Sequence, residues 1–283
     1  MQRVLIAGCG DLGMRLATRL LARGEAVWGL RRSARPLPPG LQALRADLTD
    51  PATLRDLPPG ITHVVYAVTP QARDEAAYRR AFLDGPRHLL AALDTAALAR
   101  IVFVSSSAVY GEHGGGWVDE ATPPAPPGFN GRVLLEAEAA LAAQRWPVTA
   151  LRLAGLYGPG RTRLIEEIRR GRARAPRDPP FWSNRIHIDD AAAALDLLLK
   201  LPAPAPIYVG VDDTPLPLHE LYAALATQLG APVPAEGPPP SGIGSKRLSN
   251  ARLRAAGFAP RWPDARSGYA AVIDATVAPT ASH

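Results

Sequence analysis

A glycine pattern near the start of the chain constrains the fold more than any other feature. Residues 3–8, RVLIAG, form a short apolar run that leads into G-x-G-x-x-G at Gly8, Gly10 and Gly13. Leucines at helical spacing follow until Gly24, so the order is strand, glycine turn, helix. The first glycine permits the tight turn, the second lets the backbone approach a pyrophosphate, and the third lets helix and strand pack closely. This arrangement predicts a dinucleotide site at the amino end of the helix.

Five later apolar runs have the length of buried strands, at residues 25–30, 62–68, 99–106, 147–153 and 205–211. Apolar strands that alternate with helices predict an α/β fold, a Rossmann-type doubly wound parallel sheet with a smaller C-terminal substrate lobe. We assign residues 1–155 to the Rossmann domain, completed by a strand from about 186–211. Residues 156–283 are mainly the lobe, because proline-rich pieces separate its short helices. The last residues, APTASH, are expected to fray.

The end of the second strand bears on the choice of cofactor. An Asp or Glu is expected there if the ribose 2′-hydroxyl of NAD is to be bound, but the chain has LRRS, with Arg31 and Arg32. Without a carboxylate to repel a 2′-phosphate, two guanidinium groups can bind it. The sequence therefore favours NADP, with NAD the less favoured alternative.

Composition narrows the class of protein. The 283 residues are 47% hydrophobic, which is enough for a large core, and the single cysteine, Cys9, excludes an internal disulfide. We expect Cys9 to be a small side chain that fits near the ligand. Met1 leads directly into QRVLIAGCG, and no apolar run approaches the ~18 residues of a membrane span, so we expect a cytoplasmic protein without a membrane partner. The six histidines do not have the spacing of metal ligands, so we expect no metal site. The sequence contains no G-x-S-x-G motif, which argues against a serine hydrolase.

The basic charge is concentrated in one segment. The net charge is +6, and residues 161–177 hold seven arginines. No aromatic residue lies between them to stack on bases, which argues against nucleic acid. The segment is then either a solvated face or a rim that attracts an anionic small-molecule substrate.

Several motifs in order resemble a known family. AGCGDLG, ADLTD at residues 46–50, VSSSAVYGE at 104–112, LRLAGLYGPGR and RIHIDDAA are similar to those of the extended short-chain dehydrogenases/reductases, the NAD-dependent epimerase/dehydratase group, and most of all to its atypical members. The resemblance implies a cofactor site with Asp47 and Leu48 at the adenine and Leu153 and Ala154 beside the nicotinamide. It further implies that the cofactor contacts Gly8, Cys9, Gly10, Asp11, Leu12, Gly13, Ala67, Val68 and Thr69. Ser106 matches the family's active-site Ser/Thr.

The family's catalytic pair is missing. Its reaction uses a Tyr and a Lys one helical turn later, yet none of the seven tyrosines is followed by Lys four positions on. Alignment puts Asn130 in the Tyr place and Leu134 in the Lys place, and a shift of one residue puts Phe129, which has no hydroxyl, in the Tyr place instead. It also puts Phe82 where the family has a structural Asn. We therefore consider other groups near the cleft as proton donors. They are Ser106, Tyr157, His187 and Asp84.

The helix expected within residues 126–144 then serves as scaffold. Its apolar stripe of Val133, Leu134, Ala137 and Leu141 can pack on the sheet or build a homodimer, and the sequence leaves both open. The functional prediction is an NADP(H)-dependent oxidoreductase or epimerase/dehydratase-like enzyme of unusual mechanism. The alternative is a binding protein that senses NADPH without turnover.

Overall fold

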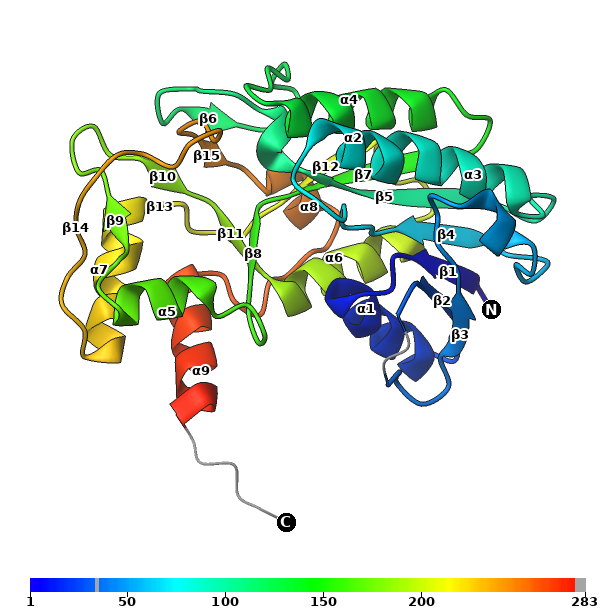
Figure 1. Ribbon diagram of the computed structural model, residues 1–283, viewed down its shortest axis with the longest axis horizontal. Coiled ribbons are helices and arrows are strands. Elements are labelled where there is room, and N and C mark those ends of the chain that lie inside the picture. The colour runs from blue at the N-terminus through cyan, green and yellow to red at the C-terminus, as the bar shows by residue number, and fades with distance from the viewer. Residues whose placement is uncertain (34–35, 278–283) are drawn as a thin grey trace, which may run out of the picture.

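A computed structural model describes residues 1–33 and 36–277 of the chain. At its centre is a sheet of seven parallel strands, which confirms the predicted fold class (Figure 1). The strand order is β12-β7-β5-β4-β1-β2-β3. Their bounds are β1 Arg3–Ala7, β2 Ala26–Arg31, β3 Gln42–Arg45, β4 His63–Tyr66, β5 Arg100–Ser106, β7 Val148–Leu153 and β12 Ile207–Gly210. Strand β3 was not predicted, because it is an edge strand that is mostly exposed and has no apolar run.

Helices cover both faces of the sheet (Figure 1). On one face lie α2 (Glu75–Arg79), the π-helical turn η2 (Arg80–Asp84), α3 (Gly85–Ala92) and α4 (Phe129–Ala142). On the other face lie α1 (Asp11–Ala22) and α6 (Ile188–Lys200), which pack against each other. The leucines of α1 that repeat at helical spacing, Leu12, Leu16 and Leu20, are buried in this core.

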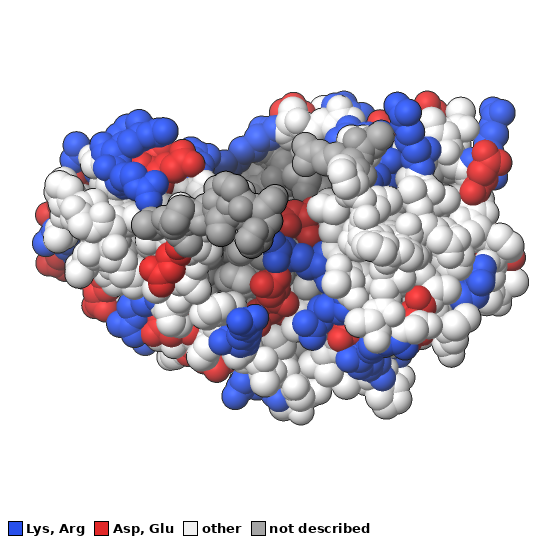
Figure 2. Space-filling view, turned by 90° about the horizontal axis from the view of Figure 1, so that it is seen from below, with Lys and Arg blue, Asp and Glu red and all other residues white. Residues whose placement is uncertain are grey.

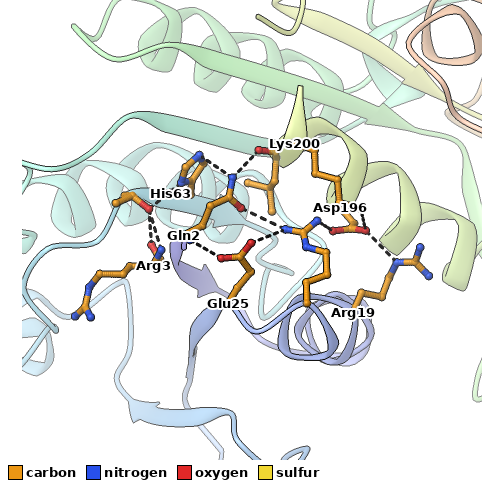
Figure 3. Close-up of polar contacts among 10 residues, drawn as sticks. Gln2, Arg3, Arg19, Glu25, His63, Asp196 and Lys200 are labelled. Atoms are coloured by element: carbon orange, nitrogen blue, oxygen red, sulfur yellow. Dashed lines mark hydrogen bonds and ion pairs between the residues drawn. The ribbon is translucent and has the colours of Figure 1, made fainter. Parts of the chain in front are cut away.

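A polar network joins the far ends of α1 and α6 (Figure 3). Asp196 of α6 is buried. Its carboxylate forms ion pairs with Arg23, with Lys200 at 2.8 Å and with Arg19 at 3.7 Å. Gln2 Nε2 donates to Leu199 O at 2.8 Å and brings the start of β1 into the same network. Because three cations surround one buried carboxylate, its charge is compensated, and α1 is held on α6.

The helix that follows β4 contains a π turn with an identifiable cause. The Tyr66 hydroxyl donates to Ala81 O at 2.5 Å, and a regular α-helix would pair that carbonyl with the N–H of Gly85. A Cβ atom at Gly85 would stand 2.2 Å from the Tyr66 hydroxyl oxygen, so only glycine admits this approach. The hydroxyl thus replaces a helical hydrogen bond and widens the turn.

The lobe is made of short elements that pair over long sequence distances. Strand β8 (Gly155–Tyr157) pairs with β11 (Arg185–His187), and β6 (Trp117–Val118) pairs with β15 (Arg247–Leu248). The other pairs are β10 (Trp182–Ser183) with β13 (Leu216–Pro217) and β9 (Arg174–Ala175) with β14 (Ala235–Glu236). The helices of the lobe are α5 (Arg163–Arg169), α7 (Leu218–Leu229) and α9 (Ala265–Val277). Helix α8 (Ala251–Ala255) packs instead on β12 of the sheet, with Leu253 in the main core. Short 3₁₀ turns follow β3 at η1 (Pro51–Leu54) and β5 at η3 (Ser107–Val109).

The segment expected to complete the sheet divides into three parts. Strand β11 stays with β8 in the lobe, α6 returns to the sheet, and only β12 joins the sheet, beside β7. The expected frayed end, 278–283, lies outside the described residues. In the part of the chain that the structure describes, no helix is long and apolar enough to cross a bilayer.

Candidate functional site

A cavity of about 950 Å³ opens at the carboxyl ends of β1, β2 and β4. The chain enters the sheet at β1 and continues to β2 on one side and to β4 on the other, and such a switch point is where doubly wound sheets bind ligands. The volume suits a ligand of dinucleotide size. The lining residues are Gly8, Cys9, Gly10, Asp11, Leu12, Gly13, Leu30, Arg31, Arg32, Ser33, Ala46, Asp47, Leu48, Thr49, Ala67, Val68, Thr69, Pro70, Gln71, Ala77, Arg80, Ala81, Val104, Leu156 and Arg161.

The glycine loop has the geometry that a diphosphate requires. Gly8 has φ +84°, and a Cβ atom there would lie 2.7 Å from Ala67 O, so this turn admits glycine alone. A Cβ atom at Gly13 would lie 3.0 Å from Ile6 Cγ2, which is the close packing of α1 on β1. Gly10 instead faces open space, and no side chain caps α1 in the described structure. The first N–H groups of α1 are therefore free to bind an anion, and the residues present fit a dinucleotide.

Cys9 is a packed thiol. Its side chain is fully buried, and a Cβ atom at Gly29 of β2 would lie 2.8 Å from Cys9 Sγ. Burial raises the pKa of the Cys9 thiol to about 11, and the nearby charge of Arg31 offsets only part of this effect. The protonated thiol has a packing role against β2 and is not an activated nucleophile.

The cavity is basic where it meets the end of β2. Arg31 and Arg32 line it, and Arg31 Nη2 donates to Ser33 Oγ at 3.2 Å. Asp47 Oδ1 is held within its own turn by Thr49, whose N–H and hydroxyl donate at 2.9 Å and 2.8 Å. The end of β2 thus presents guanidinium groups where a carboxylate would select an unphosphorylated ribose.

Two further arginines, which were not singled out from the sequence, line the cavity. Arg80 comes from the π turn, and Arg161 comes from the lobe, where its Nε lies 3.5 Å from Asp11 Oδ2. The other arginines of the basic segment do not line the cavity, and Arg172 pairs with Glu167 at 2.7 Å. Figure 2 shows basic side chains gathered around acidic ones at the lobe end of the molecule. The sequence does not show which of its thirty arginines reach the cavity, because no local pattern distinguishes Arg161 from the neighbouring arginines.

Ser106 lies at the carboxyl end of β5, beside Leu153 of β7 in the strand register. Its Oγ accepts a hydrogen bond from Ala108 N at 3.2 Å, so the hydroxyl also caps η3. The cavity just described does not include Ser106, Leu153 or Ala154; it extends toward them only as far as Val104 and Leu156. The position of Ser106 as a substrate-orienting group therefore stays a prediction.

Comparisons with known proteins agree with this geometry. The family model "NAD dependent epimerase/dehydratase family" matches residues 4–210. The chain belongs to this family. Protein YeeZ of Escherichia coli strain K12 is 34% identical over 224 residues, which are 74% of this chain and 77% of that protein.

Solved structures of this family share the whole architecture. A candidate NAD-dependent epimerase/dehydratase from Methylobacillus flagellatus is 43% identical and has a TM-score of 0.83, covering 97% of this chain and 98% of that one. MoeE5, solved with UDP-glucuronic acid and NAD, is 27% identical with a TM-score of 0.80, covering 97% and 98%. This epimerase/dehydratase-family chain accordingly has an NAD(P)-binding fold.

In this family member, Asp84 does not line the cavity at the ends of β1, β2 and β4. The Asp84 side chain is 43% exposed and pairs with Arg87 Nη2 at 3.0 Å. It lies at a groove of about 460 Å³ between α3 and α4, away from the dinucleotide cavity. The expectation that Asp84 stands near the cleft is therefore corrected: the end of the π turn directs it to the outer face of the helices.

Tyr157 and His187 lie inside the lobe and do not line the cavity. They are 1% and 3% exposed, and their rings meet edge to face at 5.2 Å because β8 and β11 are neighbours. Tyr157 also stacks on Tyr269 at 4.3 Å. Burial raises the pKa of Tyr157 and lowers the pKa of His187. Both rings pack in the interior, so their expected place near the cleft is corrected as well.

The helix at the family's catalytic position serves as scaffold. All four residues of its apolar stripe are buried within the chain, Leu134 among them, so the stripe packs without a second subunit. Gly131 permits α4 to approach η3, since a Cβ atom there would lie 2.3 Å from Ala108 O. Farther along α4, Glu138 forms a buried pair with Arg152 at 2.6 Å and accepts from Ser105 Oγ at 2.5 Å. These contacts fix α4 on β5 and β7 and supply no Tyr and Lys pair.

Proposed function

We propose that the protein binds NADP(H) in this cavity and prefers it to NAD(H). The observation that carries the proposal is the wall formed by Arg31 and Arg32 at the end of β2, where a ribose-binding carboxylate is missing. Two guanidinium groups neutralise a 2′-phosphate, and Ser33 Oγ adds a hydrogen-bonding group beside them. MoeE5 was solved with NAD, so this preference would distinguish the protein from that relative.

The catalytic part of the proposal is an oxidoreductase or epimerase/dehydratase-like enzyme that acts on a small polar or anionic substrate. NADPH, when bound, supplies a hydride. Ser106, at the strand end beside Leu153, is placed to orient a substrate carbonyl or imine by hydrogen bonding. MoeE5 was solved with UDP-glucuronic acid, which makes nucleotide sugars the first compounds to test.

A second candidate function is an NADPH-sensing protein without turnover. It is favoured by one observation, the buried Leu134 in the place of the family's Lys. The two candidates differ in one measurement, the oxidation of NADPH in the presence of carbonyl, imine and nucleotide-sugar compounds. Turnover with any of them supports the enzyme, whereas tight NADPH binding without turnover supports the sensor.

Cofactor preference is tested by calorimetric titration with NADPH and NADH. We expect the wild-type protein to bind NADPH at least ~10-fold more tightly, which corresponds to ~1.4 kcal/mol. The double variant Arg31→Ala/Arg32→Ala should lose this preference. Arg45→Ala is the matched control, because Arg45 is the register partner of Arg31 on β3 and does not line the cavity. Equal affinities in the wild type, or a preference that survives the double variant, would refute the proposal.

A further inference from the structure

Arg80 lines the dinucleotide cavity, yet the phosphate contacts proposed above do not use it. Its side chain is exposed and comes from the first residue of η2. Within residues 1–33 and 36–277, no carboxylate group forms an ion pair with its guanidinium group. A guanidinium group that lines a cavity without an ion pair keeps its donors and its planar face available to a ligand.

The π turn separates Arg80 from its neighbour in the sequence. Arg79 ends α2, and its Nη1 pairs with Glu136 Oε2 of α4 at 2.9 Å. Arg80 begins the turn that the Tyr66 hydroxyl holds at Ala81 O, and the Arg80 side chain lines the cavity instead. Two consecutive arginines therefore have different surroundings, and Arg79 offers a matched control for Arg80.

The wall beside Arg80 is apolar and has small side chains. Ala77 and Ala81, four positions apart, line the cavity with methyl groups. Leu48, from the turn after β3, lines it too and is 6% exposed. This turn is held on α3, since Leu48 O lies 3.0 Å from His88 Nδ1. Small apolar side chains beside Leu48 leave room for a flat ring next to Arg80.

Arg80 and Arg31 approach the cavity from opposite faces of the sheet. Arg31 Nη1 lies 3.8 Å from Met14 Sδ, so the Arg31 side chain reaches toward α1. Arg80 instead belongs to the layer of α2 and α3 on the other face (Figure 1). A phosphate bound by Arg31 therefore lies on the α1 side, and Arg80 faces a different part of the same ligand.

The chemistry of the ligand indicates which part Arg80 faces. In the proposed function the 2′-phosphate is bound by Arg31 and Arg32, and the adenine base is bonded to the same ribose. The base therefore lies at this end of the cavity, where Leu48 and the two alanines supply apolar surface. An uncharged flat base suits an apolar wall, whereas a phosphate there would lose its hydration.

We infer that Arg80 stacks its guanidinium plane on the adenine ring of the bound cofactor. This inference rests on the proposed function and divides the recognition of the adenosine half between two groups of residues. Arg31 and Arg32 bind the 2′-phosphate, whereas Arg80 covers one face of the base. A cation over an aromatic face is attracted by the electron density of the ring, and a planar guanidinium group also packs on it. Arg80 thus contributes affinity for any adenine dinucleotide and nothing to the choice between NADPH and NADH.

The test measures the affinities of NADPH, NADH and adenosine 2′,5′-bisphosphate by calorimetric titration. Arg80→Ala should weaken all three by the same factor, about 5-fold, which is the size of an exposed cation–π contact. Arg80→Lys keeps the charge and loses the planar group, so it should stay at least ~3-fold weaker than the wild type. Arg79→Ala should change none of the three affinities, because Arg79 pairs with Glu136 and does not line the cavity.

Four results would overturn the inference. They are unchanged affinities in Arg80→Ala, a loss confined to NADPH, a loss that spares the bisphosphate, and wild-type affinities in Arg80→Lys. A loss confined to NADPH would place Arg80 at the 2′-phosphate, and a loss that spares the bisphosphate would place it at the nicotinamide half. Failure of the proposed function is read separately, in the wild type. A wild-type protein that binds neither dinucleotide overturns both, whereas one that prefers NADH refutes the preference alone, and Arg80→Ala then still decides the inference.

Discussion

Arg161 brings a positive charge from the lobe to the glycine loop. It lies near Asp11, which also accepts from Arg15 Nε at 3.0 Å, and Arg15 in turn pairs with Asp189 at the start of α6. Asp11 lines the cavity in the first turn of α1, where it would repel a diphosphate. Arg161 and Arg15 compensate that repulsion, so the lobe takes part in the electrostatics of the cofactor site.

Arg161→Ala should therefore weaken NADPH and NADH by a similar factor, on the order of 10-fold, because both carry the same diphosphate. Calorimetry checks this prediction, with Arg163→Ala as the control, an exposed arginine that does not line the cavity. A change in the ratio of the two affinities would place Arg161 at the 2′-phosphate instead.

At the residue scale, local patterns predicted more of the site than long-range neighbours did. The glycine loop, Arg31 and Arg32 line the cavity as expected, because each stands at the end of a recognisable strand, and Asp47 lines it as the family resemblance implied. Tyr157 and His187 were misplaced because the pairing of β8 with β11 turns both rings into the lobe. Arg161 was missed because a segment rich in arginine does not show which of them reaches the cavity.

At the element scale, the π turn decides which side chains of α2 and α3 face the cavity. Ala77, Arg80 and Ala81 line the cavity, whereas Asp84 lies at the groove by α4. The sequence did not predict this break, because its cause is the hydroxyl of Tyr66, fifteen residues before Ala81. The uninterrupted helix α1 followed from the spacing of its leucines.

Tyr66→Phe and Gly85→Ala test this explanation of the π turn. Tyr66→Phe should lower the free energy of unfolding by ~1–2 kcal/mol, since the buried Ala81 carbonyl loses its donor. Gly85→Ala should cost more, because its methyl group collides with the Tyr66 hydroxyl. In the double variant the collision is relieved. Its loss of unfolding free energy should therefore be smaller than the sum of the two single losses by ~1 kcal/mol or more. Urea unfolding measures all three variants, and strict additivity would contradict the explanation.

At the scale of the whole molecule, sheet and lobe meet at Asp212, two residues after the end of β12. Its N–H donates to Arg185 O at 2.8 Å, and Thr214 N donates to its Oδ1 at 3.3 Å, while Oδ2 has no partner in the described residues. Burial raises the pKa of Asp212 to about 8, with Asp264 and Asp213 adding to the effect and Arg185 opposing it. The junction therefore holds a protonated carboxyl group at neutral pH.

This junction predicts a pH dependence of stability. The unfolded chain ionises Asp212 near pH 3.8 and the folded chain near 8, so folding is favoured most below the unfolded pKa. Stability should fall as the pH rises from about 4 to about 8, by at most ~1.4 kcal/mol per pH unit for this group. Asp212→Asn should flatten the curve in urea unfolding between these values, and the exposed Asp56→Asn should not. An unchanged slope in Asp212→Asn would contradict the prediction.

Six strands of the sheet could be predicted because each of them is a contiguous apolar run, whereas the exposed edge strand β3 and the lobe could not. Its strands are two or three residues long and pair over long sequence distances, as β6 does with β15. Such pairs leave no periodic pattern, because tertiary packing stabilises them. The expected boundary at residue 155 follows the end of β7, although β6 already leaves the sheet to pair with β15 of the lobe.

Because α6 and β12 come after the first part of the lobe, the chain passes repeatedly between the sheet and the lobe. The network around Asp196 holds α6 against α1, and β12 covers the open edge of β7. A cut after residue 155 would remove α6 from the face that it shares with α1 and would expose the edge of β7. The segments of the lobe and of the nucleotide-binding sheet thus alternate along the chain, and neither part is a single contiguous segment that one cut could release.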